Sequence, residues 1–164
     1  INISEIINKA GISRATFYRN FRNKDDIVKI KVKMFFELFF QDTYNRYRKI
    51  DHLDETYLIN SFFNSIDEHE KLISTVIKTN LEYLMEEGIL GIITMQKDQF
   101  YKLVEPNESI EKYTMDIVAS SAWTLVSKWI KTGKKEKASE LVEIYLNTFK
   151  SVYIALFGDK SELN

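Results

Sequence analysis

Apolar residues recur along most of the chain at the three- and four-residue spacing of an amphipathic helix. The first such segment, residues 3 to 10, places three isoleucines on one face. Asn2 precedes the segment and can form a capping box with Glu5, and Gly11 ends the run. The pattern therefore predicts a short N-terminal helix.

Two further helices are expected directly after this one. Ser13 is a candidate N-cap for a helix through Phe21, and Asn23 is a candidate N-cap for a much longer third helix. The third helix carries an apolar stripe at helical spacing: Ile27, Ile30, Met34 and Leu38. Its segment "MFFELFF", residues 34 to 40, is apolar on nearly all sides, so we expect neighbouring helices to enclose it.

The middle of the chain continues the helical pattern with a few interruptions. Apolar spacing predicts a helix beginning at residues 57 to 66, and the segment 71 to 84 continues helically. Gly88 and Gly91 mark a weak point in the next apolar run, and residues 105 to 107, "EPN", are expected to form a loop.

The last two helices are expected at residues 109 to 131 and 135 to 157, separated by the candidate C′ glycine Gly133. Both carry wide apolar arcs, which include Ile117, Ala122, Leu125 and Trp129 and then Ala138, Leu141, Tyr145, Phe149, Val152 and Leu156. We expect these arcs to be buried against the core and against a second subunit. The alternative is that both helices are central within a monomer.

Composition supports an all-α fold, because one proline and five glycines leave few of the turns that a sheet needs. The 164 residues suffice for one sizeable domain, or for a small domain fused to a larger one. The absence of cysteine excludes disulfides and thiolate metal sites. The sequence has neither a secretory signal nor an apolar run that could span a bilayer, so we expect a cytoplasmic protein with no membrane partner.

The charge is unevenly distributed along the chain. Residues 1 to 33 contain eight lysines and arginines against three acidic residues, a net charge of +5. The remaining 131 residues contain 15 basic and 21 acidic residues, a net charge of -6. A basic end on an acidic body is typical of a protein that brings only that end to a polyanion.

A short helix, a glycine turn and a basic second helix together predict a helix-turn-helix. The segment "ISEIINKAGISRATFYRNFRNKDDIV", residues 3 to 28, resembles the signature of the TetR family of transcriptional regulators. The matching positions are Ile6, Ala10, Gly11, Ile12, Ser13, Thr16, Tyr18, Phe21, Lys24 and Ile27. The resemblance implies a DNA-binding domain at residues 1–33 and a ligand-binding and dimerisation domain, an antiparallel helical bundle, at residues 34–164.

The resemblance also assigns roles to individual residues. Tyr18 and Lys24 would bind phosphates, assisted by Thr16 and by the amide groups of the helix that Asn23 caps. Base edges would face Arg14, Ala15 and Thr16, although Arg14 could instead contact phosphate only. The candidate DNA-binding residues are Ser13, Arg14, Ala15, Thr16, Tyr18, Arg19, Asn20, Asn23 and Lys24. The helices would be held together by Ile6, Ala10, Ile12, Phe17 and Phe21.

The chain departs from the family pattern at three points. Asn20 stands where the family often has histidine, and Arg22 stands where it often has proline. The chain also begins at Ile1, inside the motif and without the family's first helix, and we interpret it as a fragment. The closing pattern "AWTLVSKWIKTGKKEKASELVEIYLNTF", residues 122 to 149, resembles the family's C-terminal domain.

That domain often encloses a small-molecule pocket in the family, which implies an unknown small-molecule effector. Candidate pocket residues are Phe62, Phe63, Tyr83, Met85, Met95, Phe100, Tyr101, Met115 and Trp123. Methionine and aromatic residues at helical spacing are also typical of an ordinary core, and this alternative remains open.

The sequence contains no motif that favours catalysis. The two histidines are His52 and His69, and the carboxylates beside His69 in "DEHE" point in different directions on a helix, so no metal site is expected. We found neither a glycine-rich phosphate loop nor a nucleophile elbow. We therefore expect no catalytic residues, no cofactor and no enzyme activity.

Two functions remain in competition. The first is a DNA-binding, ligand-responsive repressor, a homodimer through residues 109–131 and 135–157 that binds a near-palindromic operator. The second is a coregulator of the same fold that acts through a protein partner rather than through DNA. Retention of Thr16, Tyr18 and Lys24 in a basic N-terminal segment favours the first.

Overall fold

The computed structural model describes residues 2–47, 55–95 and 108–157. Over these ranges the chain forms eight helices and no strand, so the all-α prediction is confirmed. The helices are α1 (Ile3–Ala10), α2 (Arg14–Asn20), α3 (Asp25–Tyr47), α4 (Glu55–Glu68), α5 (Glu70–Lys78), α6 (Tyr83–Met95), α8 (Glu108–Lys131) and α9 (Ala138–Phe157). The loop expected at residues 105 to 107 lies outside the described residues.

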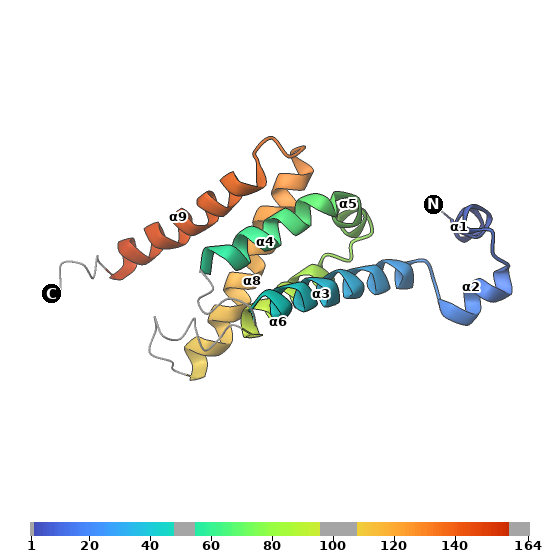
Figure 1. Cartoon of the computed structure of the whole chain (residues 1–164), viewed down its shortest axis with the longest axis horizontal. Helices are drawn as coiled ribbons and strands as arrows, with labels where there is room; N and C mark the ends of the chain where they lie inside the picture. Colours follow the sequence, from blue (N-terminus) through green and yellow to red (C-terminus); the bar gives the residue numbers. More distant parts are fainter. Residues whose placement is uncertain (1, 48–54, 96–107, 158–164) are drawn as a thin grey trace.

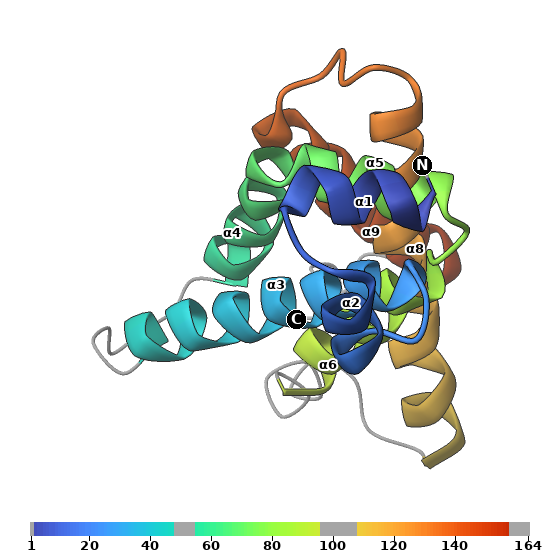
Figure 2. The same cartoon turned by 90° about the vertical axis from the view of Figure 1, so that its right-hand side faces the viewer.

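The long helix α3 connects a small head to a helical body (Figure 1). The head consists of α1, α2 and the start of α3, and Figure 2, seen from the head's side, shows α1 and α2 at an angle to each other. In the body, α3 packs on α5 and α6, both of these pack on α8, and α4 packs on α9. Because α3 runs unbroken through residues 33 and 34, the two expected domains share this helix.

One apolar cluster holds the body together, with contributions from α3 to α9. Its largest side chains include Phe35, Phe36, Phe39, Phe62, Phe63, Met85, Trp123 and Trp129. In the head, Ile7 and Phe17 are buried as well, but they lie outside this cluster. The head therefore has a small apolar centre of its own.

The apolar stripe expected on α3 is not the face that the body buries. Ile30, Met34 and Leu38 are exposed, and Leu38 keeps 59% of its surface. The buried face of α3 consists of Val32, Phe35, Phe36 and Phe39. The helix is apolar on two sides, and α5 and α6 cover the phenylalanine side, so the expected enclosure of residues 34 to 40 is only partial.

The continuous helix expected over residues 71 to 84 is wrong. Helix α5 ends at Lys78, and Asn80 has a positive φ of 55°. The N–H of Leu81 then donates to the carbonyl of Val76 at 3.1 Å, which satisfies a backbone acceptor of the helix end. Asparagine tolerates the left-handed conformation that such a cap requires, so the chain turns here before α6 begins.

Gly88 and Gly91 do not interrupt α6, which passes through both positions. A Cβ at Gly88 would overlap the ring of Phe36 on α3, whereas a Cβ at Gly91 would lie 3.6 Å from Phe40 Cζ, an ordinary contact. Gly88 is therefore required for the close approach of α3 and α6, and the expected weak point is a packing site.

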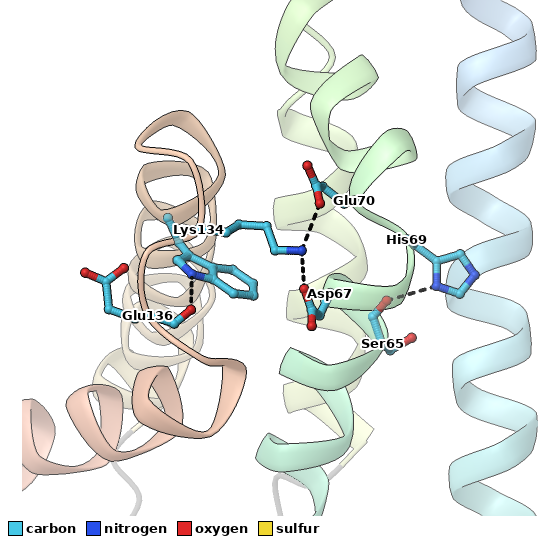
Figure 3. A network of polar contacts seen from close by, with 7 residues as sticks. Ser65, Asp67, His69, Glu70, Lys134 and Glu136 are labelled. Atoms are coloured by element: carbon cyan, nitrogen blue, oxygen red, sulfur yellow. Dashed lines mark hydrogen bonds and ion pairs between the residues drawn. The ribbon is translucent and has the colours of Figure 1, made fainter.

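The turn between α8 and α9 has the conformation expected for a C′ glycine, because Gly133 has a φ of 86°. The next residue, Lys134, donates its N–H to the carbonyl of Trp129 at 3.0 Å. Its ammonium group forms ion pairs with Asp67 and, at 2.8 Å, with Glu70 (Figure 3). The pairs connect this turn to the corner between α4 and α5.

His69 lies at the same corner and points toward α3 (Figure 3). Its Nδ1 lies 2.9 Å from the carbonyl oxygen of Ser65, which can only accept a hydrogen bond, and its ring meets Phe35 edge-on with centroids 5.1 Å apart. The corner thus contacts both the α8–α9 turn and the helix that carries the head.

Candidate nucleic-acid interface

The first helix of the head is capped as expected. The Asn2 side-chain oxygen accepts the N–H of Glu5 at 2.9 Å, and the Glu5 carboxylate accepts the N–H of Asn2 at 3.2 Å. Gly11, with a φ of 65°, lets the chain leave α1, and the N–H of Ile12 donates to the carbonyl of Ile7 at 3.2 Å. The capping box and the turn are therefore both confirmed.

Helix α2 begins at the cap that the sequence predicts. Ser13 Oγ accepts the N–H of Thr16 at 3.0 Å and lies 3.0 Å from the Thr16 hydroxyl. Phe17 is the buried residue of α2, and the rings of Tyr18 and Phe21 lie 5.3 and 5.4 Å from its ring. Anchoring through Phe17 leaves the other sides of α2 directed outward.

The burial that the sequence predicts for apolar residues of the head is only partly confirmed. Phe17 is buried, whereas Ile6, Ile12 and Phe21 are partly buried and Ala10 is exposed. Ile7 is buried instead, one position along α1.

The exposed surface of the head includes almost all of the candidate DNA-binding residues. Ser13, Arg14, Ala15, Tyr18, Arg19, Asn20, Asn23 and Lys24 are exposed, and Thr16 is partly buried. Tyr18 exposes 53% of its surface although it is aromatic. The basic side chains of residues 1 to 33 are likewise all exposed, so their charge faces solvent.

Several of the candidates also hold the head in shape. Asn20 donates from Nδ2 to the carbonyl of Thr16 at 2.8 Å. Asn23 Oδ1 accepts the N–H groups of Asp25 and Asp26 at 2.9 and 3.1 Å, which confirms its prediction as the cap of α3. These polar side chains therefore have structural partners in the isolated chain.

The turn between α2 and α3 is closed by a carboxylate. Asp26 Oδ2 accepts the N–H of Arg22 at 2.8 Å, and Asp26 also pairs with Lys29 at 3.7 Å. The hydrogen bond from Arg22 is the main reason that the pKa of Asp26 lies below its ordinary value of 3.8. The carboxylate stays ionised at neutral pH and fixes the path of the chain between the two helices.

Arg14, the first residue of α2, reaches back to α1. Its Nη2 donates to Ser4 Oγ at 2.8 Å. Sequence reasoning did not select Ser4, because no local pattern pairs it with a residue ten positions later. Only the angle between α1 and α2 brings the two side chains together.

The candidate pocket residues fall into three groups. Phe62, Phe63, Met85 and Trp123 share the main core cluster, and Met115 is also buried. Tyr83 and Met95 are exposed on the surface of α6. Phe100 and Tyr101 lie outside the described residues. His52, one of the two histidines considered as metal ligands, lies outside them too.

Two observations concern other kinds of site. Within residues 2–47, 55–95 and 108–157, no three histidine, aspartate or glutamate side chains cluster in a way that could hold a metal ion. In the same part of the chain, no helix is both long and apolar enough to cross a membrane.

The comparisons with known proteins agree with this geometry. Residues 1–29 match the family described as bacterial regulatory proteins, tetR family. The match spans α1, the Gly11 turn, α2 and the first turn of α3, which together form the head's helix-turn-helix. A comparison with curated proteins found no match. Residues 1–29 thus carry a helix-turn-helix of the tetR family of bacterial regulatory proteins, which in this chain is joined to an all-helical body.

Proposed function

We propose that the protein is a homodimeric, ligand-responsive repressor whose helix α2 enters the major groove of a near-palindromic operator. The observation that carries this proposal is the exposed face of α2, which presents Arg14, Tyr18 and Arg19 while Phe17 anchors the helix. The net charge of +5 on residues 1 to 33, against -6 on the rest, favours approach to DNA by the head alone.

The proposed DNA contacts are of two kinds: contacts to phosphates, which position the head on the duplex, and contacts to base edges, which read the sequence. Tyr18 and Lys24 bind phosphates, with help from Ser13, Thr16, Arg19 and Asn20. The amide groups at the start of α3 are left out of this set, because those of Asp25 and Asp26 donate to Asn23 Oδ1. Arg14 donates to guanine, and the methyl groups of Ala15 and Thr16 contact thymine methyl groups. Most of the affinity then comes from phosphate contacts, which predicts a steep dependence on salt.

Titration of duplex DNA at several salt concentrations tests this division. Lys24→Ala should weaken binding to every sequence and reduce the salt slope by about one unit. Tyr18→Phe removes only the hydroxyl that is proposed to bind phosphate, so it should also weaken binding to all sequences. Lys78→Ala, at an exposed position on α5, is the matched control. Equal binding by wild type and Lys24→Ala would refute the phosphate assignment.

Dimerisation is proposed through residues 109–131 and 135–157. Part of their expected apolar arc is buried inside the chain itself, as at Ala122, Trp129 and Leu141. The side chains of Phe149, Val152 and Leu156 lie outside those that the structure describes. Ile117 on α8 and Ile144 on α9 nevertheless expose 63% and 45% of their surfaces. We propose that these outward residues contact the second subunit. Binding of both heads to successive turns of the major groove then requires recognition helices about 34 to 36 Å apart.

Sedimentation measurements on three variants test the dimer. Ile117→Glu and Ile144→Glu place a charge at the proposed interface, and both residues are exposed, so the chain should still fold. They should sediment as monomers and lose operator affinity with the head intact. Leu38→Glu makes the same kind of change on α3 and should stay dimeric. A monomeric wild type, or a dimeric Ile144→Glu variant that binds DNA normally, would exclude this interface.

The body, residues 34 to 164, is proposed to take up a small-molecule effector of unknown identity. Phe62, Phe63, Met85 and Trp123 are buried together in the main core, so an apolar ligand would have to enter among α4, α6 and α8 by displacing part of this packing. Such a ligand can release DNA only if it binds one separation of the two heads better than the other. If the full-length protein binds no duplex in the salt titration, the coregulator that acts through a protein partner becomes the better proposal.

A further inference from the structure

A hydrogen bond between Arg14 on α2 and Ser4 on α1 connects the two helices of the helix-turn-helix. Arg14 Nη2 donates to Ser4 Oγ at 2.8 Å, with Arg14 exposed and Ser4 partly buried on α1. Capping of α1 is done by Asn2 and Glu5, so the local structure of α1 does not depend on the Ser4 hydroxyl. The bond instead fixes the direction of a long side chain at the start of α2.

A free arginine side chain on a protein surface loses considerable rotamer entropy when a ligand immobilises it. A neighbour that already holds the guanidinium reduces this cost, provided that the held conformation is the one used in binding. The guanidinium has five N–H donors in a rigid fork. One bond to Ser4 leaves enough donors for a bidentate contact to guanine.

We propose that Ser4 is a positioning residue, which holds Arg14 in the conformation that reads a base in the major groove. This inference rests on the proposed function, because it assumes that Arg14 contacts bases. Ser4 itself contributes no base contact. Its effect is on sequence preference, whereas the phosphate contacts of Tyr18 and Lys24 set the affinity for all DNA.

The test uses the full-length protein and two duplexes of equal length and composition. One is selected by the wild-type protein from a random-sequence pool, and the other is its scrambled counterpart. Ser4→Ala should weaken binding to the selected duplex by about 2- to 10-fold and leave the scrambled duplex unchanged. Ser4→Thr keeps the hydroxyl and should stay within about 2-fold of wild type. Asn8→Ala, at an exposed polar position of α1, is the control.

The Arg14→Ala background separates positioning from a general structural effect. In that background Ser4→Ala should cause no further loss, because the side chain that it positions is absent. Selection with the Ser4→Ala variant should also relax the preference at the same base pair as selection with Arg14→Ala. A loss that persists without Arg14, or an equal or tighter binding of the selected duplex by Ser4→Ala, would overturn the inference.

The outcomes also distinguish this inference from the proposed function. If Arg14→Ala loses selectivity and Ser4→Ala does not, Arg14 reads a base and only the role of Ser4 is refuted. If Arg14→Ala weakens both duplexes equally, or the wild type selects no duplex, base reading by Arg14 fails and the role of Ser4 fails with it.

Discussion

The close approach of α3 and α6 predicts that Gly88→Ala destabilises the body. An alanine Cβ at this position overlaps the Cδ2, Cε2 and Cζ atoms of Phe36. Phe36 is buried and its ring lies against Phe35 with centroids 5.1 Å apart, so the ring cannot simply turn toward solvent. The added methyl group therefore forces the two helices apart or moves Phe36 from its site.

The magnitude follows from two opposing contributions to the free energy of unfolding. Overpacking a core lowers the free energy of unfolding by about 1 to 3 kcal/mol. Replacing glycine by alanine inside a helix raises it by about 0.5 to 1 kcal/mol. Gly91→Ala receives the same gain in helix propensity, but its Cβ meets only Phe40 at 3.6 Å. The two variants should therefore differ by the overpacking cost alone, with Gly91→Ala slightly more stable than wild type.

Urea unfolding followed by far-UV circular dichroism measures this difference. Gly88→Ala should show a lower midpoint than both wild type and Gly91→Ala, at a similar m-value. Gly88→Ala should cost less in a Phe36→Leu background, because the ring that it overlaps is gone. Equal stability of Gly88→Ala and Gly91→Ala would show that Phe36 does not occupy the space beside Gly88.

Three further predictions concern charges and backbone conformation. Lys134→Met removes two ion pairs and a cation–π contact and should lower the free energy of unfolding by about 1 kcal/mol. The carboxylate partners raise the pKa of Lys134 above 10.5. Urea titrations should therefore show wild type more stable than Lys134→Met below pH 10.5, and the two should converge as the pH rises further. Asp26→Asn should be less stable than wild type above pH 3.8, and the two should converge as the pH falls below that value, because the N–H of Arg22 lowers the Asp26 pKa. Asn80→Gly should raise the thermal midpoint and Asn80→Ala should lower it, since Asn80 has a φ of 55°.

The predictions for the head were largely local, and most of them are confirmed. The caps at Asn2, Ser13 and Asn23 and the left-handed Gly11 each depend on residues within a few positions of one another. The contact between Arg14 and Ser4 has no such local signal, because it arises from the angle between two helices. The roles of the exposed α2 residues on DNA remain predictions.

The sequence by itself determined that the chain is helical, where most helices begin and end, and that the basic charge lies at one end. These features follow from short-range periodicity, capping and composition, which act within about one turn of helix. Tertiary structure decided which apolar face of α3 is buried, because the stripe with Leu38 and the face with Phe36 satisfy the same spacing. Packing against α5 and α6 selects the Phe36 face, and the missing side chain at Gly88 makes that packing possible. Long-range packing of this kind is a property of several helices together, and no single segment specifies it.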